Sequence, residues 1–224
     1  MKTSSFKLKG AHIAAFIVLL LIFDQALKFY IKTHFYLGEV RSVFGNWFQL
    51  CFVENAGMAW GLSFGGSIGK ILLTFFRLVA VIGGTFYLRN LIRKKAKAGF
   101  IICVALIYAG AAGNLIDSMF YGLLFNQSYG CDASAAASCA GSVAHFLPKS
   151  GGYAGFMHGR VVDMLSLPLI DTELPNWLPV WGGTRFTFFD PVFNLADSYI
   201  SVSVFILIIF QKKLFGEKSN ILTD

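Results

Sequence analysis

The sequence predicts an all-α membrane protein in which four transmembrane helices carry a small extracytoplasmic subdomain that contains β-strands. Of its 224 residues, 56% are hydrophobic and 14% are charged, whereas soluble domains have about 45–50% and about 25%. Four apolar segments are candidates to cross a bilayer, which takes about 20 residues each. These spans use less than half of the chain, so the remainder has to form sizeable segments outside the membrane.

The first span is expected at residues about 11–31, after three lysines in the first nine residues. A basic start followed by an apolar run is also typical of a secretory signal peptide. No small-residue cleavage pattern follows, and the apolar run continues to Ile31. We therefore interpret this segment as a retained span.

The other three spans are expected at residues about 72–88, 100–117 and 195–210, within a single polytopic membrane domain that covers the chain from 1 to 224. Eleven of the 19 basic residues lie near the two termini and in the short loop between the second and third spans. Because Lys and Arg concentrate on the cytoplasmic side, both termini are expected in the cytoplasm and the loops at about 33–70 and 119–193 outside. We interpret the net charge of +7 as a topology signal and expect no nucleic-acid partner.

The outer loops are expected to contain short strands and irregular segments. Residues 43–53 are rich in aromatic and β-branched side chains, with Gly45 and Asn46 as a turn, and predict one or two strands. Residues 130–142 are rich in Ala, Ser and Gly, which is typical of a surface insertion. Residues 168–183 contain three prolines and two tryptophans, which favours an irregular segment at the level of the lipid headgroups.

Four of the twelve acidic residues converge on one layer of the membrane. A helix rises about 1.5 Å per residue, which places Asp24 beyond the midplane and Asp117 at the outer end of the third span. Asp197 opens the fourth span from the outer side, and Asp163 lies in a short apolar stretch of the outer loop. Charged groups at this depth are costly and need partners, so we interpret the layer as a functional site.

Three pairs with helical spacing also have a structural interpretation: Asp24–Lys28, Asn114–Asp117 and Asn194–Asp197. The first pair can form an i, i+4 ion pair, and the second can cap or bridge helices. Either member of the third pair can be the N-cap of the fourth span. Asp163 is harder to explain structurally, because it is an acid without a partner inside an apolar run.

Two carboxylates that lie close together in a site of lowered dielectric share a proton. The ionised carboxylate can then act as general base towards water while the protonated one polarises a carbonyl group, as in aspartic proteases. This chemistry uses no metal ion, and we expect neither a metal nor a cofactor. The substrate would be a peptide that reaches the outer membrane interface.

Five short segments carry a resemblance to a known family, in the order in which that family has them. They are residues 23–28 (FDQALK), 54–60 (ENAGMAW), 110–117 (GAAGNLID), 159–164 (GRVVDM) and 193–198 (FNLADS). In these segments the chain resembles lipoprotein signal peptidase (signal peptidase II), from the first span to the start of the fourth.

The resemblance implies a bacterial four-span endopeptidase that removes the signal peptide from prolipoproteins at the outer face of the cytoplasmic (inner) membrane, just before the diacylglyceryl-modified Cys. It implies that Asp163 and Asp197 are the catalytic dyad, and it leaves open which of them is the base. The implied supporting and substrate-binding residues are Asp24, Lys28, Asn55, Gly57, Asn114, Asp117, Arg160 and Asn194. Lipidated prolipoproteins and membrane lipid are the implied partners, and a monomer is expected.

The chain departs from the family at two places. The family usually has Arg directly after the Asp of the third motif, where this chain has Ser118. Arg77 and Arg160 are both candidates to supply that charge. The third and fourth motifs are usually close in sequence, but Asp117 and Asp163 are 46 residues apart here.

The enlarged outer loop contains two cysteines, Cys131 and Cys139, in a compartment where disulfides persist, and we expect a bridge between them. Cys51 is also expected outside and leaves other pairings open. A zinc site that adds His145 and His158 to the loop cysteines is disfavoured, because the spacing matches no closed-site pattern.

A proton-coupled membrane transporter is the alternative function, because such proteins also use acids inside the membrane. That class predicts acids spread across the membrane depth, including the inner leaflet, where the predicted spans have none. The sequence also contains no internal repeat of the kind from which many transporters are built.

Overall fold

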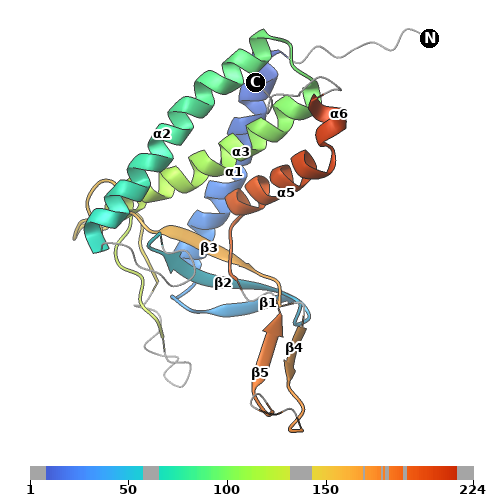
Figure 1. Ribbon diagram of the computed structural model, residues 1–224. Coiled ribbons are helices and arrows are strands. Elements are labelled where there is room, and N and C mark those ends of the chain that lie inside the picture. The colour runs from blue at the N-terminus through green and yellow to red at the C-terminus, as the bar shows by residue number, and fades with distance from the viewer. Residues whose placement is uncertain are drawn as a thin grey trace.

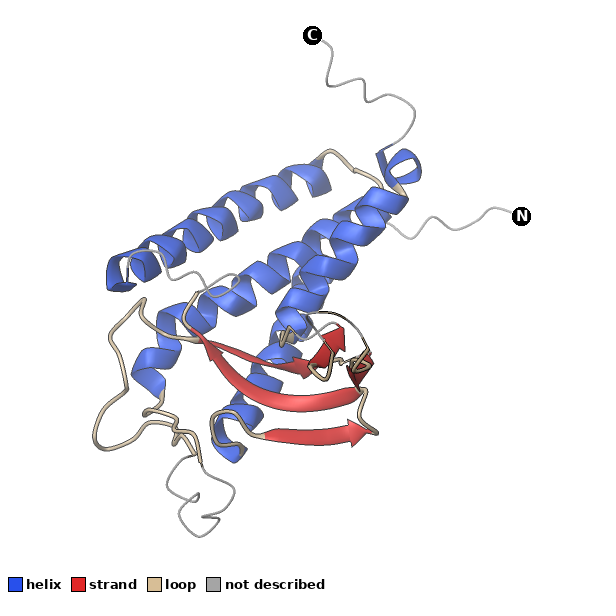
Figure 2. Ribbon diagram, turned by 60° about the horizontal axis from the view of Figure 1, so that its bottom comes forward, coloured by secondary structure: helices blue, strands red, loops and turns tan. Residues whose placement is uncertain are grey.

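Residues 9–57, 66–131, 143–168, 170–177, 179, 182–188 and 191–215 are described by the structure, a computed structural model. Long helices lie side by side, and the strands gather at one end of them (Figure 1). From a second direction the strands, drawn in red, again form one group (Figure 2). The molecule therefore has a helical part and a smaller β part.

The helical part consists of α1 (Gly10–His34), α2 (Gly66–Arg93), α3 (Ala98–Ile116) and α5 (Leu195–Ile209). The chain leaves α3 through one π-helical turn, η1 (Asp117–Tyr121), and the short α4 (Gly122–Leu124). A short α6 (Gln211–Phe215) follows α5. α3 is the central helix, because it packs against α1, α2 and α5.

Three helices are long and apolar enough to cross a membrane: Gly10–His34, Ile68–Arg93 and Ala98–Leu124. They cover the first three predicted spans and extend beyond the predicted bounds. Large apolar side chains on them face outward, including Phe23, Phe76 and Phe86 with exposed fractions of 58%, 60% and 65%. Such exposure is typical of helices whose surroundings are lipid. The fourth predicted span corresponds to α5, an apolar helix of 15 residues.

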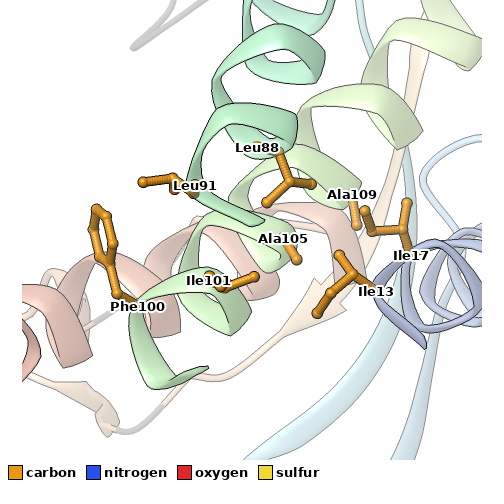
Figure 3. Close-up of a cluster of buried hydrophobic side chains, with 8 residues drawn as sticks. All are labelled: Ile13, Ile17, Leu88, Leu91, Phe100, Ile101, Ala105 and Ala109. Carbon is orange, nitrogen blue, oxygen red and sulfur yellow. The ribbon is translucent and has the colours of Figure 1, made fainter. Parts of the chain in front are cut away.

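Two clusters of buried apolar side chains hold the molecule together. The first joins α1, α2 and α3 away from the strands and contains Ile13, Ile17, Leu88, Leu91, Phe100, Ile101, Ala105 and Ala109 (Figure 3). The second joins the end of α1 to η1 and the strands and contains Ile31, Phe35, Phe52, Tyr121, Phe125, Ala144, Val162 and Met164. The β part is therefore fixed to the helices by a common core.

Small residues in the third motif let the helices approach closely. A Cβ atom on Gly110 would lie 2.4 Å from the backbone oxygen of Ala196, and one on Gly113 would lie 2.6 Å from Oδ2 of Asp24. Real Cβ contacts are longer than this, so only glycine allows α3 to pack on α1 and α5 at this distance.

The main sheet has three antiparallel strands in the order β1 (Val40–Phe44), β2 (Phe48–Asn55) and β3 (Val161–Ser166). The prediction of strands around a turn at Gly45 and Asn46 is confirmed. β3 carries the fourth motif, and its Asp163 is paired with Val53 of β2. The sheet thus places a motif acid beside the start of the second motif, 109 residues earlier in the chain.

The prediction of an irregular segment at 168–183 is wrong at its start. β4 (Ile170–Glu173) pairs with β5 (Arg185–Phe188) in an antiparallel hairpin. The prolines that suggested irregular backbone flank or connect these strands, so they do not interrupt the hydrogen-bond ladder. Within the predicted surface insertion at 130–142, residues 132–142 lie outside the described residues.

Candidate active site

A return of the chain onto β3 brings the fourth and fifth motifs together. The backbone N–H of Phe193 donates to Leu165 O at 3.0 Å, and the N–H of Leu165 donates to Phe193 O at 2.7 Å. This bridge fixes the residue directly before Asn194. The start of α5 therefore lies beside Asp163, although the β4–β5 hairpin separates them in sequence.

Asn194 connects the two predicted catalytic acids. Its Nδ2 donates to Oδ1 of Asp163 at 2.6 Å, and its Oδ1 accepts the backbone N–H of Asp197 at 2.9 Å. The Asp197 carboxylate in turn accepts the backbone N–H of Asn194 at 3.4 Å. Asn194 is thus the N-cap of α5 and a side-chain partner of Asp163 at the same time, so its structural and functional interpretations both apply.

Asn114 of α3 holds Asp197 from the other side. Its Nδ2 donates to Oδ1 of Asp197 at 2.8 Å, and its Oδ1 accepts from Nζ of Lys28 at 2.9 Å. The Asn114 side chain is buried, and its amide nitrogen and amide oxygen each bind one of these two groups. It therefore links the acid on α5 to the cation on α1.

Lys28 is fully buried and makes three contacts with its ammonium group. Its Nζ lies 2.9 Å from Oδ2 of Asp24 and 2.8 Å from Oδ2 of Asp117, besides the bond to Asn114. The predicted i, i+4 ion pair is confirmed, and a second acid shares the cation. Three acceptors match the three donors of an ammonium group, so the buried charge is completely hydrogen-bonded.

Gln25 and Tyr121 are not among the predicted site residues, but they also belong to this network. Nε2 of Gln25 donates to Oδ1 of Asp117 at 2.9 Å and to Oδ2 of Asp24 at 3.1 Å, and the Tyr121 hydroxyl donates to Oε1 of Gln25 at 3.1 Å. The signal for Gln25 was its place in an apolar span beside Asp24, where an amide needs partners. Tyr121 lies outside the five motifs and had no such signal.

Backbone groups complete the partners of the two acids that share Lys28. The N–H of Ala196 donates to Oδ1 of Asp24 at 3.0 Å, and the N–H of Val162 donates to Oδ2 of Asp117 at 3.3 Å. Asp24 therefore fastens α5 to α1, and Asp117 fastens β3 to η1. These acids hold in place the two elements that carry Asp197 and Asp163.

Asn55 and Gly57 reach the site from the end of β2. Oδ1 of Asn55 accepts the N–H of Gly57 at 2.8 Å, and the Asn55 side chain hydrogen-bonds to Asp163. Gly57 has φ of +97°, a conformation that side chains with a Cβ rarely adopt. The second motif thus supplies an amide to Asp163 and the glycine turn that orients it.

Burial and the charge of Asp197 raise the pKa of Asp163 to about 7, although hydrogen bonds from Asn194 and Asn55 act in the opposite direction. Asp163 is 4% exposed. A carboxyl group with such a pKa can hold or release a proton near neutral pH, which is what general acid–base chemistry requires.

Arg160 belongs to a second buried network that the sequence did not predict. Its Nη1 lies 2.9 Å from Oε2 of Glu54, and Glu54 also pairs with the fully buried Lys32 and accepts from Oγ of Ser128 at 2.9 Å. Burial opposes ionisation of Glu54, but Lys32 and these hydrogen bonds hold its pKa below the ordinary value. The backbone N–H of Arg160 donates to the Tyr153 hydroxyl at 2.6 Å. Arg160 thus fixes the start of β3 and is paired with Glu54.

Cys131 is disulfide-bonded. Its predicted partner Cys139 lies outside the described residues, so the pairing stays a prediction. Among the described residues, no group of three or more His, Cys, Asp or Glu side chains is arranged to hold a metal ion.

The family Signal peptidase (SPase) II matches residues 16–212 of the chain. The chain belongs to the signal peptidase II family. It is therefore a membrane aspartic peptidase, and the alternative of a transporter no longer applies.

Individual signal peptidase II relatives agree with this assignment. A lipoprotein signal peptidase of Porphyromonas gingivalis (strain ATCC 33277) is 45% identical over 202 residues, which cover 90% of this chain and 83% of that protein. One from Amoebophilus asiaticus (strain 5a2) is 34% identical, over 87% of this chain and 75% of that protein. A solved structure described as a bacterial membrane enzyme has a TM-score of 0.55 at 21% identity and covers 97% of this chain and 98% of its own. That likeness supports the fold.

Proposed function

We propose that Asp163 and Asp197 are the catalytic dyad of this peptidase, which cleaves prolipoproteins just before their diacylglyceryl-modified Cys. One observation carries the choice of this pair: the four acids of the layer differ in their partners. Asp24 and Asp117 share the ammonium group of Lys28. Within the described ranges, Asp163 and Asp197 form no ion pair and are held by neutral amides. Only the second pair is free to share a proton and to exchange it with a substrate.

The dyad acts through one shared proton. Asp163, whose pKa is about 7, holds that proton and donates it towards the carbonyl oxygen of the scissile peptide bond. Asp197 takes a proton from water, whose oxygen attacks the carbonyl carbon. The tetrahedral intermediate then collapses as the C–N bond breaks: the proton held by Asp197 passes to the leaving nitrogen of the Cys, and one hydroxyl proton of the intermediate returns to Asp163. The amides of Asn194, Asn114 and Asn55 orient the two carboxyl groups throughout.

The proposal includes a fourth span and an orientation. α5 is about 22 Å long at 1.5 Å per residue, and α6 follows it in the chain. All but one of the exposed side chains of α5 are apolar, Ser201 being the exception, and Phe205 is 65% and Ile209 69% exposed, as suits a lipid-facing helix. The basic flanks support a cytoplasmic location for both termini and an extracytoplasmic location for the dyad, and the enzyme is proposed to be a monomer of one polytopic domain.

Cleavage of a synthetic diacylglyceryl-modified precursor by the full-length protein in detergent tests this function. We expect Asp163→Asn and Asp197→Asn each to reduce turnover by about 100-fold or more, because either change removes the shared proton or its acceptor. Asp171→Asn is the matched control, since Asp171 lies in the separate β4–β5 hairpin, and it should keep the parent's turnover.

Two outcomes would contradict the proposal. Near-parental turnover of either dyad variant would reject the dyad. Equal cleavage of the precursor with and without the diacylglyceryl group would reject the lipidated substrate. Thermal melting of each variant shows whether it is folded, so a loss of structure is not mistaken for a loss of chemistry.

A further inference from the structure

Arg77 is a cation inside the membrane part of the molecule that the proposed mechanism does not use. It lies in α2, about 16 Å from the helix start at Gly66 at 1.5 Å per residue, and it is half-buried. None of the five motifs contains it. A charged side chain at this depth is costly unless neighbouring groups compensate it, so its partners are informative.

The guanidinium group of Arg77 is fastened to the site through a neutral side chain. Its Nη1 donates to Oγ of Ser118 at 2.8 Å, and that hydroxyl donates to the backbone oxygen of Asn114 at 2.8 Å. Ser118 is 2% exposed, so the contact is fixed by packing. Arg77 is thereby tied to the same residue whose side chain holds Asp197.

Arg77 interacts with the dyad electrostatically and not by direct contact. The carboxylates whose charges interact with it are those of Asp197, Asp117 and Asp163. Within the part of the chain that the structure describes, no carboxylate forms an ion pair with Arg77. A guanidinium group held near two carboxylates by a hydroxyl favours a negative charge on them, yet leaves their oxygens available to water and substrate.

Two other cations near the dyad are held in ion pairs. Lys28 is shared by Asp24 and Asp117, and Arg160 is paired with Glu54. The charged groups on the elements around the site are Asp24 and Lys28 on α1, Glu54 on β2, Lys70 on α2, Asp117 on η1 and Arg160 before β3. Lys70 forms no ion pair among the described residues, and its charge acts on Glu54, Arg160 and Arg77. Arg77 is linked to Asp197 through Ser118 and Asn114, and its charge interacts with that carboxylate.

We propose that Arg77 is a positioning residue of the peptidase, which sets the pH range in which the dyad carries one negative charge. This inference rests on the proposed function, because it assumes that Asp163 and Asp197 share a proton. The positive charge makes the first ionisation of the dyad easier and also makes the second easier. Removing it moves both arms of the pH–rate profile to higher pH, whereas a purely structural loss lowers the rate without moving the arms.

The test compares kcat/KM against pH for the parent, Arg77→Gln, Arg77→Lys and Arg89→Gln on the lipidated precursor. We expect Arg77→Gln to move both arms upward by about one pH unit, because an opposite charge at short range has an effect of this size. Arg77→Lys keeps the charge and should restore the parental arms. Arg89 is an exposed arginine on the same helix, twelve residues further on, and Arg89→Gln should change neither arm.

If folded Arg77→Gln keeps both arms of its pH–rate profile at the parental pH values, the inference is overturned, whatever the size of kcat/KM. If Arg77→Gln does not fold, the same pH profile is measured for Arg77→His. The histidine at this position carries a positive charge only at acid pH. It should move the alkaline arm and leave the acid arm in place, and two unmoved arms would again overturn the inference. Failure of the dyad itself is distinguishable, since it appears as activity in Asp163→Asn or Asp197→Asn.

Discussion

At the scale of the residue, the four acids of one layer separate into two chemical types. The convergence of Asp24, Asp117 and Asp197 could be predicted from the sequence, because spacing along apolar spans sets where each of them lies. Their partners could not, because Lys28 reaches Asp117 and Asn114 only through the packing of α1 on α3. The family resemblance named the dyad, and the contacts supply a physical reason for that pair: a cation neutralises one pair, whereas amides hold the other.

Removal of the shared cation should be strongly destabilising. Lys28→Met leaves Asp24 and Asp117 buried together without their ammonium group, and breaking a buried ion pair in this way costs about 3–5 kcal/mol. We expect a large fall in the melting temperature of the detergent-solubilised protein. Lys94→Met, at an exposed position after α2, serves as the control. A Lys28→Met variant that melts with the control would show that the network does not contribute to stability.

Asp163 should make stability depend on pH. Its pKa is raised to about 7 in the folded protein, so folding favours its neutral form. The stabilisation is complete below the unfolded pKa of about 3.9 and is lost as the pH rises through 7. The parent should therefore lose up to about 4 kcal/mol relative to Asp163→Asn between pH 4 and pH 8. Denaturant unfolding of both proteins across this range checks the sign, and parallel curves would contradict it.

At the scale of the element, the third motif is a packing surface as well as a source of polar groups. Its glycines let α3 contact α1 and α5 at backbone distance. The spans at 11–31, 72–88 and 100–117 could be predicted as helices, because long apolar runs leave few alternatives. The β4–β5 hairpin was missed, since four-residue strands give little periodic signal and the neighbouring prolines suggested irregular backbone.

Gly110→Ala tests the packing of α5 on α3. The new Cβ would lie 2.4 Å from the backbone oxygen of Ala196, so α5 has to move. We expect a loss of about 1–3 kcal/mol in stability and a fall in turnover, because Asp197 moves with the helix. Gly83→Ala on α2 is the matched control, since nothing lies within 4 Å of its Cβ position. That variant should be unchanged or slightly more stable. Equal behaviour of the two variants would exclude the close approach as a requirement.

At the scale of the whole molecule, the site is assembled from elements far apart in sequence. α1, β2, α3, β3 and α5 each contribute at least one polar group. The hydrophobic excess and the basic flanks predict a membrane topology, and the acidic layer predicts where a site lies. The second network around Glu54 could not be predicted, because Lys32 and Glu54 become neighbours only when β2 packs beside the end of α1.

The proposed topology can be tested with single cysteines on the two sides. Trp177, in the β4–β5 connection, is 78% exposed, and Lys94 is exposed in the loop after α2. In intact spheroplasts, a membrane-impermeant thiol reagent should label Trp177→Cys above the parental background and should not label Lys94→Cys. Permeabilised cells should show labelling of both. The reverse pattern in intact cells would invert the orientation.

Because Asn194 joins Asp163 to the start of α5, the order in which the chain is synthesised determines when both acids are present. The N-cap that starts α5 also holds Asp163, and the following turn supplies Asp197. A chain that has emerged only as far as β3 has one acid of the dyad and lacks the other. The proposed dyad is therefore complete only when α5 has formed and docked on β3 and α3. Docking of α5 and assembly of the proposed catalytic pair are one event.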